Sequence, residues 1–366
     1  MDTNINWDSL DGPTLQKQLE QYCTDEGISD IHFAPEKAEV RLDVRQHGIL
    51  VELARLSHKT YQDVIRQIKF VAKLKLNVTN IPQDGHYTFT YKSRAVNVRV
   101  ASIPSRFGEK FTLRILDPQR GIVPLEQLGF EKEIYEKLAE IVQIPNGLFL
   151  ITGPTGSGKT TTLYALLNTI AGKDRNIITL EDPVEYELPG IVQSQMDPEH
   201  DYTFSSGLRS VLRHDPDVIL VGEIRDYETA QTAIDAALTG HLVLSTLHTN
   251  SAVEAIQRFL AMGVSPYTFA PALRAILGQR LVRTLKPECK DGNCDVASNE
   301  SYNGRTALPE LLIATPSVRQ QILDNATTDD IETAAKKDGY RTMKEWGKIL
   351  VERKVTSDAE IKRVTM

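Results

Sequence analysis

Residues 148–160 read Leu-Phe-Leu-Ile-Thr-Gly-Pro-Thr-Gly-Ser-Gly-Lys-Thr. The apolar run at 148–151 predicts a strand, the glycines predict a loop, and the residues after Lys159 predict a helix. A glycine loop between a strand and a helix is the arrangement that binds phosphate groups. By chance the bare pattern should occur in roughly one of a hundred chains this long. The alternative interpretation is a glycine-rich surface turn, and the flanking strand and helix make it the weaker one.

Each position of this loop has a chemical reason. The glycines let successive backbone N–H groups turn toward one point, and the positive end of the helix dipole adds to the attraction for an anion. We expect Lys159 to reach the terminal phosphates and Thr160 to hold Mg²⁺. The predicted nucleotide contacts are Gly153, Pro154, Thr155, Gly156, Ser157, Gly158, Lys159, Thr160 and Thr161.

Composition limits the alternatives. The chain has 366 residues, enough for two domains, and its net charge of −7 disfavours nucleic acid as the main substrate. The first residues lack the pattern of a signal peptide and no long apolar window occurs, so we expect a cytoplasmic protein. The cysteines, Cys23, Cys289 and Cys294, are too few and too scattered for a disulfide framework, which agrees with a reducing compartment.

The chain divides into two halves. Residues 1–116 combine helical patterns near 15–23 and 61–72 with short alternating runs at 39–44 and 96–100, which predicts a small α+β domain. Two prolines and a glycine at 117–124 interrupt both the helical and the strand periodicity, which predicts a linker. From residue 125 to 366, apolar strands alternate with helices, as in an α/β domain with a parallel sheet.

Carboxylates follow two predicted strands of the second half. Residues 176–180 lead into Glu181 and Asp182, and residues 217–221 lead through Gly222 into Glu223. The carboxyl ends of parallel strands meet at the edge where α/β proteins bind ligands. We therefore expect Glu181 or Glu223 to orient or deprotonate a water, and Glu223 to help hold Mg²⁺. The alternative is that these acids cap helices or lie in solvated turns.

A third strand, within 240–250, lies between two histidines. His248 follows the strand end and precedes a capped helix, a position from which its side chain can contact a terminal phosphate. For His241, a structural role in packing or capping is as good an interpretation as a functional role.

At this point the chain resembles a known family, the secretion ATPases that drive type II secretion, type IV pilus assembly and DNA uptake. Residues 153–160 match its Walker A motif, 178–185 its aspartate box, 219–223 its Walker B motif and 240–250 its histidine box. Gly222 reproduces the glycine that this family has in Walker B where most phosphate-loop enzymes have aspartate. The resemblance implies an α/β fold: a small α+β (PAS-like) N-terminal domain followed by a RecA-like P-loop ATPase domain with a helical C-terminal region.

The resemblance extends to the first half, through residues 29–32, 82–85 and 99–114. In relatives, arginines at the positions of Arg99 and Arg114 reach the nucleotide site of the adjacent subunit of a hexamer. A guanidinium suits this role because its charge is permanent and its fork matches phosphate oxygens. From the residues alone, an ordinary solvated strand residue is the better interpretation of Arg99, and the resemblance reverses this preference. The resemblance thus implies ATP and Mg²⁺ as ligands, a homohexamer, and an inner-membrane platform protein as partner.

The chain departs from the family pattern in several places. Residues 78–81 replace a usual pair of basic residues, and Gln46-His47-Gly48 stands where Asp-Gly is common. Relatives often carry two Cys-x-x-Cys pairs that bind zinc, whereas only Cys289 and Cys294 occur in that region, so we predict no zinc. The long N-terminal extension of many relatives is also missing.

Three functions remain open. The first is an ATPase motor for pilus, pseudopilus or secretion, cytoplasmic and peripheral at the membrane face through its partners. Residues 280–283 and 304–312 look more like assembly ATPases, and the short N-terminus without a zinc motif resembles competence ATPases. The second is a retraction motor of the same family. The third is a nucleic-acid translocase or helicase, which the acidic balance and the lack of an aromatic and basic stripe disfavour, so no direct nucleic acid binding is expected.

Overall fold

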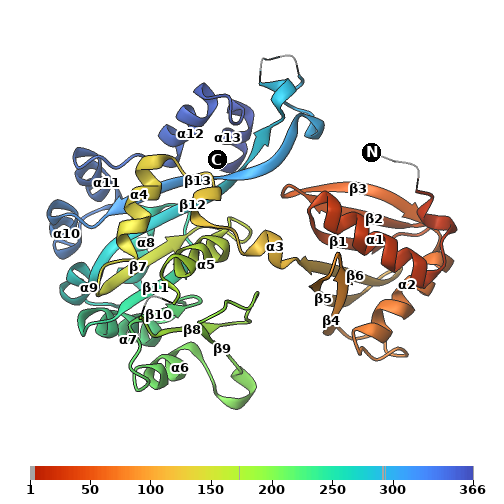
Figure 1. Cartoon of the computed structure of the whole chain (residues 1–366), viewed down its shortest axis with the longest axis horizontal. Helices are drawn as coiled ribbons and strands as arrows, with labels where there is room; N and C mark the ends of the chain where they lie inside the picture. Colours follow the sequence, from red (N-terminus) through yellow and green to blue (C-terminus); the bar gives the residue numbers. More distant parts are fainter. Residues whose placement is uncertain (1–4, 173, 291, 293, 366) are drawn as a thin grey trace. The chain divides into compact units, whose positions relative to one another are not determined.

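The computed structural model describes residues 5–172, 174–290, 292 and 294–365. The chain forms two compact units, Met1–Gly121 and Ile122–Met366. Each unit has its own sheet, and within the described residues these have six and seven strands (Figure 1). Among these residues, no helix is both long and apolar enough to cross a membrane.

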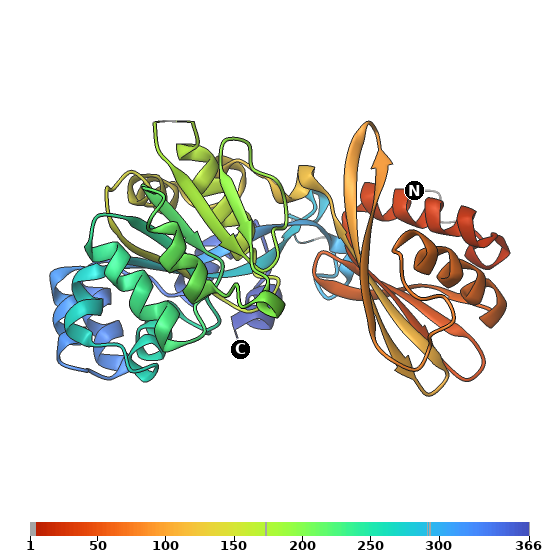
Figure 2. The same ribbon diagram turned by 90° about the horizontal axis from the view of Figure 1, so that it is seen from below.

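The first unit is an antiparallel sheet with helices on one face. Its strand order is β3-β2-β1-β6-β5-β4. The strands are β1 (Ile28–Pro35), β2 (Val40–Gln46), β3 (Ile49–Leu56), β4 (Gln83–Tyr91), β5 (Arg94–Ser105) and β6 (Gly108–Leu116). Two helices, α1 (Gly12–Glu26) and α2 (His58–Val71), lie together on one face, as Figure 2 shows. Alternate strand residues such as Val98, Val100 and Leu113 are buried against them, because successive strand side chains point to opposite faces.

The second unit is an open, mainly parallel sheet in the order β13-β12-β7-β11-β10-β8-β9. Its strands are β7 (Gly147–Thr152), β8 (Ile177–Glu181), β9 (Val192–Gln195), β10 (Val218–Val221), β11 (Leu242–Leu247), β12 (Leu273–Leu285) and β13 (Tyr302–Ile313). Strands β7, β10 and β11 are buried along their whole length, since clusters of apolar residues cover both faces of the sheet. Strands β12 and β13 form an antiparallel pair at one edge.

Helices surround this second sheet. They are α4 (Lys132–Ile141), α5 (Lys159–Ile170), α6 (Phe204–Val211), α7 (Tyr227–Leu238), α8 (Ala252–Ala261), α9 (Pro266–Ala272), α10 (Pro316–Leu323), α11 (Thr328–Lys337), α12 (Met343–Glu352) and α13 (Asp358–Thr365). A short helix, α3 (Pro118–Gly121), ends the first unit, and single turns lie at 7–9, 125–127, 198–200, 287–289 and 299–301. Apart from β8 and β9, which follow each other directly, strands alternate with helices from β7 to α8, as the sequence predicts.

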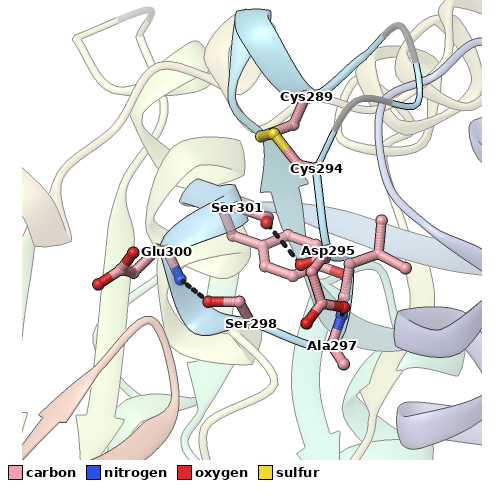
Figure 3. Close-up of a disulfide and its surroundings, with 9 residues drawn as sticks. Cys289, Cys294, Asp295, Ala297, Ser298, Glu300 and Ser301 are labelled. Atoms are coloured by element: carbon pink, nitrogen blue, oxygen red, sulfur yellow. Dashed lines mark hydrogen bonds between the residues drawn. A yellow bond between two sulfur atoms is a disulfide. The ribbon is translucent and has the colours of Figure 1, made fainter.

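The segment between β12 and β13 differs from the sequence-based expectation. Cys289 and Cys294 form a disulfide, shown in Figure 3, whereas the sequence pattern predicts no disulfide framework. Their α-carbons lie 5.0 Å apart, within the usual range for a bridge, and the spacing in the sequence does not reveal this distance. Cys289 packs against Leu285 and Tyr302, and Cys23 is a buried free thiol in α1.

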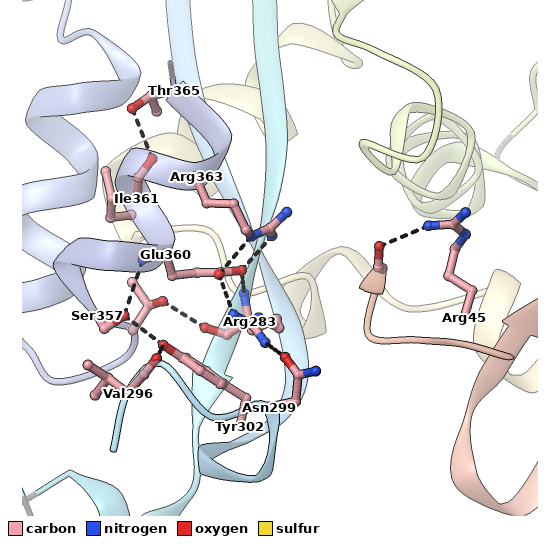
Figure 4. A network of polar contacts seen from close by, with 12 residues as sticks. Arg45, Arg283, Val296, Asn299, Tyr302, Ser357, Glu360, Ile361, Arg363 and Thr365 are labelled. Carbon is pink, nitrogen blue, oxygen red and sulfur yellow. Dashed lines mark hydrogen bonds and ion pairs between the residues drawn. The ribbon is translucent and has the colours of Figure 1, made fainter. Parts of the chain in front are cut away.

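A buried ion pair holds α13 against β12 (Figure 4). The guanidinium of Arg283 lies 2.8 Å from the carboxylate of Glu360, which also accepts two hydrogen bonds from Arg363. Burial acts to raise the pKa of Glu360, but the hydrogen bonds from Arg363 and Arg283 outweigh it and lower this pKa to about 2. Glu360 is therefore ionised at any physiological pH.

Candidate functional site

The carboxyl ends of four parallel strands meet at one edge of the second sheet. Strand β7 pairs in parallel with β11, β11 with β10, and β10 with β8. Their ends lead into the glycine loop, the segment with His248, the segment with Glu223 and the segment with Glu181. The topology thus brings together at one edge the four motifs predicted from the sequence.

The glycine loop has the backbone of a phosphate cradle. Gly156 and Gly158 have φ angles of 78° and 86°, a conformation that side chains disfavour. Residues 154–156 and Thr160 are exposed, and Thr161 is half-buried. The Ser157 hydroxyl is buried and lacks a hydrogen-bond partner among the described residues. An open apex next to an unsatisfied buried donor fits a phosphate, because such a group supplies the missing acceptor.

Lys159, the first residue of α5, is folded back onto this loop. Its ammonium donates to the carbonyl oxygens of Gly153 at 2.7 Å and Pro154 at 3.1 Å. Burial lowers the pKa of Lys159 to about 8, an effect that Glu223 opposes and Arg280 reinforces. Lys159 is only 9% exposed, since it is folded onto the loop. A phosphate bound in the loop would replace these carbonyl oxygens as the partner of its ammonium.

Glu223 and His248 lie beside Lys159. The Nε2 atom of His248 is 3.9 Å from Glu223 Oε2, and Glu223 pairs with Arg225. Burial and then the charge of Lys159 lower the pKa of His248, while Glu223 raises it, so the ring is neutral near pH 7. Lys159 and His248 can donate to a phosphate, whereas Glu223 is partly exposed, so its carboxylate can reach a water.

Glu181 has a different environment. It is 4% exposed, and its oxygens accept hydrogen bonds from Thr179 at 2.6 Å, from Gln193 at 3.0 Å and from Tyr164. Burial and then the nearby Glu181 raise the pKa of Tyr164, which keeps the phenol protonated as a donor. The carboxylate therefore ties α5 to β8 and β9 and has little capacity left for a water.

Local contacts explain two features of these segments. A Cβ added to Gly222 would lie 3.1 Å from the Leu180 carbonyl oxygen and 3.2 Å from the ring of Phe204, so only glycine fits without a shift. The segment after His248 is held by Thr249, whose N–H donates to the Thr152 hydroxyl at 2.9 Å. The end of β7 thus fixes the backbone next to His248.

Arg99 and Arg114 belong to the first unit. They are directly opposite each other in the antiparallel pair of β5 and β6. Arg114 lies 2.9 Å from Asp30 of β1, which offsets the repulsion between two like charges on facing positions. Both side chains lie on the sheet face opposite α1 and α2, because the neighbouring residues Val98, Val100 and Leu113 are buried in the helix-covered core.

Sequence reasoning missed two polar residues of the second unit that contact the predicted site residues. Arg225 pairs with Glu223, and its position two residues later along the same segment was the available signal. Gln279 of β12 contacts the glycine loop at Ser157, 122 residues away in the sequence. Nothing local in the sequence indicates that pairing.

Three comparisons with known proteins bear on this geometry. A family model described as "Type II/IV secretion system protein" matches residues 12–363. The type II secretion system protein HxcR of Pseudomonas aeruginosa is 41% identical, over 98% of this chain and 79% of that protein. The type IV pilus assembly ATPase PilB of Thermus thermophilus is 38% identical, over 92% of this chain and 41% of PilB. The chain therefore spans only part of each of these relatives.

A solved structure extends the likeness to the fold. The crystal structure described as the pilus retraction motor PilT with bound ADP aligns with a TM-score of 0.68 and 28% identity, covering 95% of this chain and 96% of PilT. Together with the two sheets, this likeness confirms the predicted fold class, a small α+β domain followed by a RecA-like ATPase domain. The predicted limits of the two domains stay a prediction.

Proposed function

The chain belongs to the type II/IV secretion system protein family, and we propose that it is a hexameric ATPase motor that powers assembly of a type IV pilus, a competence pseudopilus or a type II secretion pseudopilus. Relatives named as ATPases support an ATP-hydrolysing enzyme. The observation that carries the proposal is the cluster of Lys159, Glu223 and His248 beside a phosphate-type loop. ATP is the proposed substrate.

The residues of the loop bind and orient the triphosphate. Backbone N–H groups of the glycine loop and of the first turn of α5 would face the phosphates, and Lys159 would exchange its contacts with Gly153 and Pro154 for phosphate oxygens. Thr160 and Glu223 would hold Mg²⁺, which neutralises charge that develops on the phosphates. Because phosphoryl transfer needs little covalent help, this positioning supplies most of the rate.

Glu223 is the proposed base. The oxygens of Glu181 already accept hydrogen bonds from three side chains, whereas Glu223 is partly exposed and pairs with Arg225. We assign to Glu181 the positioning of α5 and β9, and to neutral His248 a contact with the terminal phosphate. Arg99 and Arg114 would supply positive charge to the site of a neighbouring subunit, so that catalysis needs the ring.

A retraction motor is the second candidate, because the PilT structure resembles this chain over nearly its whole length. Assembly is favoured since HxcR and PilB, which are named for secretion and for pilus assembly, share 41% and 38% identity with the chain over 98% and 92% of its length. Deleting the gene in the source cell distinguishes the two. Loss of filaments or of secretion supports an assembly motor, whereas an excess of filaments identifies a retraction motor.

The proposed partner is an inner-membrane platform protein, and the chain would be peripheral at the cytoplasmic face through that contact. A pull-down of membrane proteins with the tagged chain tests this proposal and identifies the machine. Recovery of a polytopic platform protein supports it. Stimulation of ATP hydrolysis by single-stranded DNA, with no membrane protein recovered, would instead indicate a translocase.

A further inference from the structure

Gln279 is a buried amide on β12 that contacts both the phosphate loop and the helix that follows it. It is 1% exposed. Its Nε2 group donates to the Ser157 carbonyl oxygen at 2.8 Å, and its Oε1 atom accepts from the Thr162 hydroxyl at 2.9 Å. One side chain therefore joins the loop backbone to the first turn of α5 (Lys159–Ile170).

The loop fits closely against this residue. A Cβ added to Gly158 would lie 2.9 Å from Gln279 Nε2, and one added to Gly153 would lie 2.4 Å from the Gln279 carbonyl oxygen. Both glycines therefore approach Gln279 more closely than other residues could. Since β12 pairs in parallel with β7, and Gly278 is opposite Thr152, the position of Gln279 is set by the central sheet.

The adjacent residue contacts the second half of the site. Arg280 donates to the Asn250 carbonyl oxygen at 3.0 Å, in the segment that follows His248. Consecutive residues of β12 thus contact the phosphate loop and the segment next to His248. A buried amide with both ends bonded can take only one orientation without leaving a polar group unsatisfied.

We propose that Gln279 is a positioning residue for nucleotide binding: its amide fixes the Ser157 carbonyl and the start of α5, so that the loop N–H groups point at the phosphates before the nucleotide arrives. The inference rests on the proposed function, because it names a residue that supports the same site. Preorganised donors bind a charged group more tightly since less ordering is needed on binding.

The test compares variants by calorimetric titration with MgADP and by the KM and kcat for ATP. Gln279→Met keeps the length of the side chain but removes both polar ends, so we expect the Kd for MgADP and the KM for ATP to rise about tenfold. Thr162→Val removes the hydroxyl donor and should weaken binding less, while Thr162→Ser, which keeps it, should bind like the wild type. The Gln279→Met and Thr162→Val double variant should bind like Gln279→Met alone, since both changes remove one shared bond.

Gln257→Met is the matched control. Gln257 of α8 (Ala252–Ala261) also donates to a carbonyl oxygen, that of Ala326, at 2.8 Å, but does not touch the loop. The Gln257→Met variant should bind MgADP like the wild type, even if its thermal unfolding temperature falls as much as that of Gln279→Met. Equal loss of binding in both glutamine variants would overturn the proposal, because it would reflect general destabilisation.

Two further results contradict the inference. One is a folded Gln279→Met protein whose Kd for MgADP stays within about twofold of the wild type, a change too small for a lost hydrogen bond. The other, which applies even if Gln279→Met does not fold, is equal MgADP affinity in Thr162→Val and Thr162→Ser. A wild-type protein that neither binds MgADP nor hydrolyses ATP would contradict the proposed function itself, so the two failures are distinguishable.

Discussion

Lys159 satisfies its ammonium with two carbonyl oxygens of its own loop, those of Gly153 and Pro154. These contacts keep the side chain at the loop, where a bound phosphate would replace the two carbonyl oxygens as its partner. Glu223 is held by its ion pair with Arg225. The charged groups of the site therefore have defined positions before a ligand binds. Such preorganised charges supply most of the electrostatic contribution to catalysis.

The first prediction concerns Lys159. Replacing it with alanine removes the charge next to the phosphates, so we expect ATP hydrolysis to fall by at least about 100-fold. Phosphate release by the purified variant measures this. Lys137→Ala, which removes a half-buried lysine paired with Glu133, is the matched control and should keep wild-type activity. Near-normal hydrolysis by folded Lys159→Ala protein would contradict the assignment of the loop.

The second prediction separates the two glutamates. Glu223→Gln should still bind ATP but lose hydrolysis, since the amide keeps the shape and cannot accept a proton. Glu181→Gln should retain part of its turnover and lose stability, because it disturbs the hydrogen bonds from Tyr164, Thr179 and Gln193. ATP binding and hydrolysis are measured separately, with the exposed Glu187→Gln as control. A trapped, ATP-loaded state in Glu181→Gln alone would move the base to that residue.

At the scale of elements, local sequence patterns were sufficient to predict the strands and helices whose contacts are local. The apolar runs before Gly153, Glu181, Glu223 and His248 are β7, β8, β10 and β11, because each run is short, continuous and buried on both faces. The helix after Lys159 is α5. The site edge then follows from parallel pairing, and its acidic and histidine residues could be predicted from sequence position alone.

Contacts between distant segments could not be predicted in this way. Gln279 reaches Ser157 across 122 residues, and the pairing of β12 with β7 has no signal in either segment. The bridge between Cys289 and Cys294 requires their α-carbons to lie close together, and the spacing in the sequence does not reveal this. The buried pair of Arg283 and Glu360 joins residues 77 positions apart, and each residue alone resembles an ordinary exposed charge.

The third prediction tests that pair. Glu360→Gln leaves Arg283 buried without its partner, so the free energy of unfolding of the second unit should fall by about 3 kcal/mol near pH 7. Because folding lowers the pKa of Glu360 from 4.5 to about 2, the wild type keeps this stability above pH 4.5 and loses it as the pH falls toward 2. Urea unfolding at several pH values measures the difference.

The same experiment needs a control, and Glu352→Gln provides one, since Glu352 ends the neighbouring helix α12 and is exposed. Its effect should stay within about 0.5 kcal/mol. The difference between the wild type and Glu360→Gln should shrink as the pH falls below 4.5. A difference that is constant from pH 7 to pH 3 would show that the ionised carboxylate of Glu360 does not stabilise the fold.

At the scale of the whole molecule, the order of the motifs identified the family before the fold was known. The match over residues 12–363 bears this out. The assembly of subunits could not be derived in this way, because the residue pattern of one chain does not show which residues contact a neighbouring subunit. Arg99 and Arg114 lie opposite each other on the first unit, and Lys159 and Glu223 lie on the second. The proposed ring places these two sets on opposite sides of each interface between subunits.

The central claim, a ring whose active sites are completed by a neighbour, is tested most directly by mixing inactive variants. Arg99→Ala with an intact loop and Lys159→Ala with intact arginines should each be inactive alone. After subunit exchange, the mixture should recover part of the phosphate release, because some interfaces then pair an intact loop with intact arginines.

A mixture of Lys159→Ala with Glu223→Gln is the control, and it should stay inactive, since both variants keep the arginines and neither has an intact site. Recovery of phosphate release in the first mixture and not in the second is the predicted result. No recovery in either mixture, with exchange of subunits shown independently, would place Arg99 outside the neighbour's site and contradict the account.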